Sequence, residues 1–112
     1  MFEDWKHQTA HTKQSFAELG KKYPKMLQAY GALNAAATEG NVLDEKTREL
    51  IALAVAVTTR CESCLSVHAA AAVKAGATEE EVASALATAI SLNAGAAYTY
   101  SLRVLEAFNQ QK

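Results

Sequence analysis

The fold of this chain is decided by residues 43–68, which read LDEKTRELIALAVAVTTRCESCLSVH. Asp44 stands where its side chain can accept hydrogen bonds from the free N–H groups of a helix start, and Glu45 suits the positive end of the helix dipole. An uninterrupted apolar run follows over residues 50–57. The stretch therefore predicts a helix that opens at Asp44 and runs to the pair Thr58-Thr59.

The run 50–57 is also compatible with a buried strand, because periodicity does not separate the two over so short a length. A strand followed by CxxC and a helix is the order found in thioredoxins. That fold needs several strands and a cis-proline after the motif. The chain offers no second strand candidate, and its single proline, Pro24, precedes the motif. We therefore exclude the thioredoxin fold.

Thiol chemistry is indicated by Cys61, Cys64 and His68. Cysteines three apart share a helix face and can close a disulfide, and a histidine four residues further lies on that same face. We expect Thr59 to cap the second helix with Glu62 as its N3 residue, which places Cys61 in the first turn. Free N–H groups there favour the reactive thiolate, and the histidine can take the thiol proton or stabilise the thiolate as imidazolium.

Glu49 joins this group only if the chain reverses. On one continuous helix it would lie ~18 Å from Cys61, at a rise of ~1.5 Å per residue. A turn near Thr58-Thr59, midway between residues 49 and 68, would bring Glu49 beside His68 in an antiparallel helix pair. A carboxylate would then hold and charge the imidazole that activates a thiol.

Two other interpretations of the same residues stay open. Free cysteine is among the most buried residue types, so both cysteines could be part of the core. Cys61, Cys64, His68 and Glu49 could also bind zinc, although structural zinc sites prefer more thiolates. We expect neither a metal nor another cofactor.

The remaining sequence is helical in character throughout. Alanine supplies 24 residues and glycine plus proline only six, a balance that favours helix over strand. Caps and stops predict a single compact domain over residues 1–112 with about six helices. They lie at about 2–21 with a stop at Gly20, from Pro24 to Gly40, from Asp44 to the turn, from the cysteines to Gly76, from a capping box at Thr78–Glu81 onward, and at 95–108.

Charge and hydropathy exclude several classes of protein. A net charge of −1 gives no electrostatic footprint for nucleic acid or an anionic membrane surface. The start of the chain lacks the apolar core of a secretory signal, and the run 50–57 is too short to span a bilayer. We expect a soluble cytoplasmic protein. Residues 50–57 and 82–92 are apolar around much of the helix, which predicts a stable homo-oligomer.

The spacing Glu49-x11-Cys61-x-x-Cys64-x-x-x-His68 in an alanine-rich helical chain resembles the alkylhydroperoxidase D core of the carboxymuconolactone decarboxylase family. The lead-in residues 43–53 and the segment 76–86 also resemble that family. The resemblance covers residues 43–105 well and the first helices loosely. The signature of four residues at fixed spacing is fairly specific, whereas a bare CxxC is not.

The resemblance implies reduction of a peroxide by the cysteine pair, with a protein or lipoyl-type dithiol as electron donor. By position, Cys64 is the attacking thiol, Cys61 the resolving thiol, and Glu49 with His68 the proton relay. It also implies a trimer or hexamer. The best-known alkylhydroperoxidase has a second histidine where Ser63 stands, so the implied relay is shorter here.

Two other functions remain as alternatives. The decarboxylase branch of the family acts on a small organic acid without the cysteine pair, and would need basic residues around a carboxylate. The chain offers Arg48, Arg60, Lys74 and Arg103, with no evident convergence. The second alternative is a redox-sensing helical assembly module, in which the pair reports oxidation with little turnover.

Overall fold

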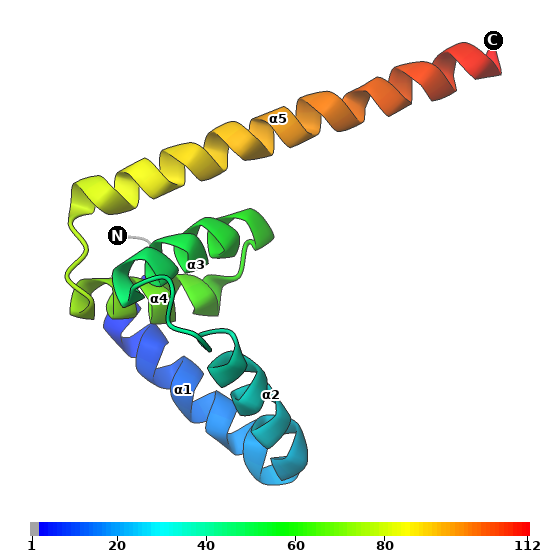
Figure 1. Ribbon diagram of the computed structural model, residues 1–112. Helices are drawn as coiled ribbons and strands as arrows, with labels where there is room; N and C mark the ends of the chain where they lie inside the picture. The colour runs from blue at the N-terminus through cyan, green and yellow to red at the C-terminus, as the bar shows by residue number, and fades with distance from the viewer. Residues whose placement is uncertain (1–2) are drawn as a thin grey trace.

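The computed structural model describes residues 3–112, and over that range the chain forms helices and turns without a strand (Figure 1). The five helices are α1 (Trp5–Lys22), α2 (Pro24–Ala36), α3 (Glu45–Thr59), α4 (Glu62–Lys74) and α5 (Glu79–Gln111). The predicted all-helical class is confirmed. Phe2, which we placed in the first helix, lies outside the described residues.

The central pair α3 and α4 is built as predicted, except at the turn. Asp44 caps α3 by accepting a hydrogen bond from the Thr47 N–H at 2.8 Å. Arg60 follows the last residue of α3 and reverses the chain through its left-handed backbone (φ 55°), and Cys61 with extended backbone opens α4. The cap predicted at Thr59 was wrong. Thr59 is the last residue of α3, and its hydroxyl donates to the Val55 carbonyl of the preceding turn.

Glycine and threonine signals between α4 and α5 were interpreted correctly. Gly76 takes a φ of +85°, and its N–H bonds the Val73 carbonyl while the next N–H reaches back to Ala72. This pattern closes the end of a helix and favours glycine. Thr78 and Glu81 then form the predicted capping box, each side chain accepting a hydrogen bond from the other residue's N–H.

The fifth and sixth predicted helices are one helix. α5 runs for 33 residues without a break and extends well beyond the other four helices (Figure 1). The sixth helix was expected to start at about residue 95, but the glycine at that position costs a helix only ~1 kcal/mol and does not interrupt it. The number of helices is therefore five rather than six.

The first two helices form a hairpin whose turn is set by proline. Pro24 is the first residue of α2, as predicted, and Tyr23 before it leaves the helical region. Gly20 does not stop α1, which continues to Lys22. It is instead the one buried residue of this helix, because Leu27 of α2 packs against it where a side chain would stand.

The buried core is small and centres on α3. Leu53 and Ala56 of α3, Ala72 of α4 and Ala89 of α5 are the buried apolar residues, with Ser66 as the buried polar residue. Every residue from 90 to 112 is exposed. Within residues 3–112, no helix is long and apolar enough to cross a membrane.

Candidate active site

The two cysteines meet at the start of α4. Cys61 is the N-cap and Cys64 lies in the first turn, with their Cα atoms 5.2 Å apart and a disulfide between them. The Sγ atom of Cys61 lies 3.7 Å from the Ser63 hydroxyl. The motif is thus in its oxidised form, which the spacing of three allows.

The position of Cys64 gives its sulfur a favourable electrostatic setting. The first backbone bond of α4 runs from the Leu65 N–H to the Cys61 carbonyl, so the N–H groups of residues 62–64 have no partner within the helix. These groups and the positive end of the helix dipole favour a negative charge on a nearby sulfur after reduction. Glu62, an acid in the same turn, opposes this effect.

Glu49 lies beside His68, as the predicted chain reversal requires. The Nδ1 atom of His68 is 2.7 Å from Glu49 Oε1, across the α3–α4 pair. Because a carboxylate only accepts, this bond places a proton on Nδ1 and leaves Nε2 free to accept another. The side chains are partly exposed, 37% for the histidine and 21% for the glutamate. The pair is therefore within reach of solvent and of a small substrate.

A cavity of about 320 Å³ opens beside Cys64, between α4 and the first two helices. Its lining comes from three helices: Thr12, Lys13 and Phe16 of α1, Tyr30 and Asn34 of α2, and Ser63, Cys64, Val67 and His68 of α4. The Phe16 and Tyr30 rings lie 5.3 Å apart and form an aromatic wall. Cys64 and His68 therefore share one recess that can hold a small molecule.

The residues that α1 and α2 contribute to this cavity were not singled out from the sequence. Lys13, Phe16 and Tyr30 lie more than 30 residues from the cysteine motif, and no spacing relates them to it. Contact between α1 and α4 brings Lys13 and Phe16 to the site, and the pairing of α2 with α1 brings Tyr30. The amphipathic pattern of α1 was visible, but the helix against which it packs was not.

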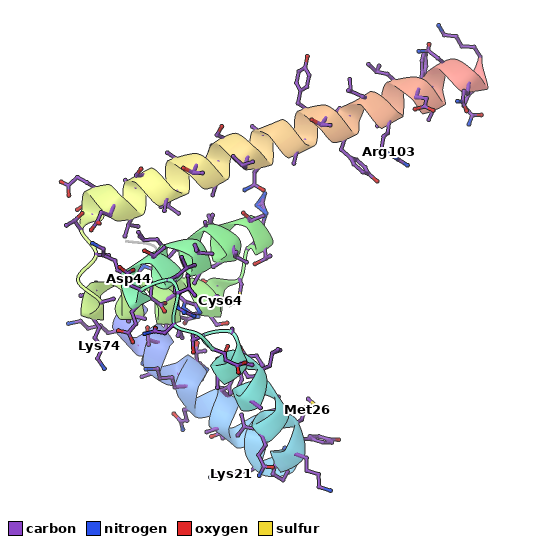
Figure 2. All side chains as sticks on the ribbon, viewed as in Figure 1. Lys21, Met26, Asp44, Cys64, Lys74 and Arg103 are labelled. Carbon is purple, nitrogen blue, oxygen red and sulfur yellow. A yellow bond between two sulfur atoms is a disulfide. The ribbon has the colours of Figure 1, made fainter. Side chains whose placement is uncertain are left out.

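The geometry supports neither the zinc site nor a cluster of basic residues for an organic acid. Among the described residues, no group of three or more His, Cys, Asp and Glu side chains is placed to hold a metal ion. The four basic residues considered for acid chemistry do not line the Cys64 cavity. Arg48 donates instead to the carbonyls of Leu43 and Ala37, and Arg103 lies far along α5 from Cys64 (Figure 2).

A family model and several relatives match this chain. Residues 24–107 match the carboxymuconolactone decarboxylase family. An uncharacterized protein of Haemophilus influenzae is 79% identical over 112 residues, which are 100% of this chain and 99% of the relative. Uncharacterized protein 4 in the cox locus of Paracoccus denitrificans is 35% identical over 73% of this chain and 74% of its own length.

Solved structures show the same fold. A carboxymuconolactone decarboxylase family protein from Legionella pneumophila, in its apo form, superposes with a TM-score of 0.74 at 35% identity, covering 95% of each chain. A protein from Methanobacterium thermoautotrophicum superposes with a TM-score of 0.72 at 29% identity. That match covers 80% of this chain and 97% of the other.

Proposed function

Since the chain belongs to the carboxymuconolactone decarboxylase family, we propose that it is the thiol-dependent kind of member, a hydroperoxide reductase or disulfide oxidoreductase. The family includes both alkylhydroperoxidase-like and decarboxylase members. The observation that carries the choice is the 2.7 Å contact between Glu49 and His68. It orients a histidine, with Nε2 free to accept a proton, one helical turn after a cysteine that can form a disulfide with Cys61.

The first step of the proposed reaction consumes the hydroperoxide. His68 Nε2 accepts the proton of the reduced Cys64 thiol, and the thiolate attacks the terminal peroxide oxygen. The O–O bond breaks, and the leaving alkoxide takes the proton back from His68. The products are an alcohol and a sulfenic acid on Cys64. Glu49 stabilises the imidazolium while it holds the proton.

The second step returns the pair to the oxidised form. Cys61 attacks the Cys64 sulfur, the S–O bond breaks, and the hydroxide leaves with the Cys61 proton as water. The two electrons that reduced the peroxide have then come from the two thiols. A dithiol donor, of protein or lipoyl type, reduces the disulfide by exchange and becomes a disulfide itself.

Two further features belong to this proposal. The cytoplasm suits the reaction, because its thiol systems keep a cysteine pair reduced and ready to attack. We also propose that the chain works as a homo-oligomer, a trimer or hexamer, because a single chain leaves large apolar side chains of α5 exposed.

The test is consumption of an organic hydroperoxide with dithiothreitol as donor. The wild-type protein should turn over many times, and Cys64→Ser should lose all turnover. Cys61→Ser, reduced beforehand and freed of dithiothreitol, should complete one attack and leave a sulfenic acid that dimedone labels, because no resolving thiol is then present. Turnover of a small organic acid that persists in Cys64→Ser, without peroxide consumption by the wild type, would favour the decarboxylase alternative.

A further inference from the structure

We propose that Lys13 binds the carboxylate of the substrate, so that the cavity beside Cys64 selects organic hydroperoxides that carry an acid group. This inference deepens the proposed function and rests on it. Hydrogen peroxide and neutral hydroperoxides of the same skeleton would then be poorer substrates.

The first argument is the placement of three kinds of group around one recess. Lys13 and Cys64 line the same cavity, one from α1 and the other from α4. Phe16 lies three residues after Lys13, on the same face of α1, and pairs with Tyr30 of α2. A cation, an aromatic wall and the reactive sulfur therefore border one volume. These features suit a molecule with an acid, an apolar body and a peroxide group.

The second argument is charge. No aspartate or glutamate lines the cavity, and His68, its other ionisable base, already has Glu49 as partner. Within residues 3–112, Lys13 forms no ion pair. Its ammonium group is thus available to an anion, and the Thr12 hydroxyl and Asn34 amide on the same lining can add hydrogen bonds.

The third argument is size. A volume of about 320 Å³ lies at the small end of the range for small-molecule sites, roughly 300–1,000 Å³. Hydrogen peroxide would occupy only a little of it and would not contact the aromatic wall. A medium-chain or aromatic acid hydroperoxide can contact Phe16 and Tyr30 while its carboxylate meets Lys13.

The kinetic test compares a medium-chain acid hydroperoxide with its methyl ester. The wild-type protein should prefer the acid in kcat/KM, and Lys13→Met should reduce this preference about tenfold, mainly through the KM of the acid. Lys13→Arg should restore most of it. Lys22→Met is the matched control, since it removes an exposed lysine of the same helix outside the cavity, and it should leave the preference as it is.

A binding test separates this inference from the proposed function. The corresponding saturated fatty acid, which cannot react, is titrated calorimetrically into the disulfide form of the wild-type and Lys13→Met proteins. If the wild-type protein binds the fatty acid, Lys13→Met weakens this binding, and no hydroperoxide is turned over, the carboxylate site is supported and the peroxidase activity is rejected.

Two results would overturn the inference while the peroxidase stands. One is equal use of acid and ester, with a preference that Lys13→Met does not change. The other is an equal loss of kcat for both substrates in Lys13→Met, since that loss would place the lysine charge at the Cys64 thiolate rather than at a carboxylate.

Discussion

At the residue scale, the proposed chemistry depends on one contact between two helices. Glu49 and His68 are 19 residues apart and meet at 2.7 Å. The sequence predicted this contact because two antiparallel helices joined by a turn midway between these residues bring the residues side by side. The turn itself lies at Arg60 and Cys61, two residues later than the predicted Thr58-Thr59. Glu49 and His68 still meet across the helix pair.

Glu49→Gln tests the contribution of the carboxylate. The glutamine keeps the size of the side chain but loses the charge that stabilises the imidazolium, so kcat/KM for hydroperoxide should fall by about tenfold or more. His68→Asn should lower it further, within the 10²–10⁴-fold expected of general acid–base catalysis. Glu45→Gln, an exposed acid on the same helix, is the control and should keep the wild-type rate. A wild-type rate in Glu49→Gln would contradict the relay.

The position of Lys13 at the cavity could not be predicted from the sequence. The cysteine–histidine spacing is local, so helix geometry relates its members directly. Lys13 reaches the same cavity only because α1 packs on α4, a contact that depends on the whole arrangement of the hairpin. Nothing in the sequence distinguishes this exposed lysine of α1 from the others, because the packing of α1 on α4 is not visible there.

At the element scale, three helix starts and the stop at Gly76 were predictable, whereas the start of α4 and the behaviour of Gly20 were not. Asp44 and the Thr78–Glu81 box cap the helices that they were expected to open, and Pro24 is the first residue of α2. These signals act through hydrogen bonds or φ restrictions of the same few residues. Gly20 and Gly95 stay inside helices. Whether a glycine ends a helix depends on its neighbours, and at Gly20 on the packing of Leu27.

The start of α5 predicts a pH effect on stability. A salt bridge to Lys46 (2.8 Å) and the Thr78 N–H lower the pKa of Glu81 below its ordinary value of 4.5. A lowered carboxyl pKa contributes stability at neutral pH that is lost as pH falls through the folded-state pKa. Glu81→Gln should therefore lower the Tm at pH 7, and the difference should be smaller at pH 3, where protonation of the carboxyl group weakens the salt bridge. Equal differences at both pH values would contradict this account.

At the scale of the whole molecule, one chain leaves too much surface exposed. Its accessible surface is 9145 Å², against about 6,000 Å² for a folded monomer of this mass. The radius of gyration is 18.1 Å, against about 13 Å for a globule of this length. The exposed large apolar side chains include Leu102, Leu105 and Phe108 of α5, each at least half exposed.

We therefore predict that copies of this chain assemble, as the apolar character of residues 50–57 and 82–92 already indicated. Light scattering at micromolar concentration should give the mass of a trimer or hexamer. Leu105→Asp should lower that mass and the Tm, because it places a charge in the apolar stripe of α5. Glu106→Gln, its neighbour, should change neither. A wild-type mass of 12.0 kDa would contradict assembly.

The central claim is that Cys64 is an activated thiol, and the most direct test follows thiolate absorbance at 240 nm against pH. The reduced wild-type protein is compared with Cys61→Ser and Cys64→Ser. One thiol should titrate well below the ordinary ~8.5, and this titration should be kept in Cys61→Ser and lost in Cys64→Ser. Titration of both cysteines at or above ~8.5 would contradict it, since the helix start and the Glu49–His68 pair would then leave the thiols unactivated.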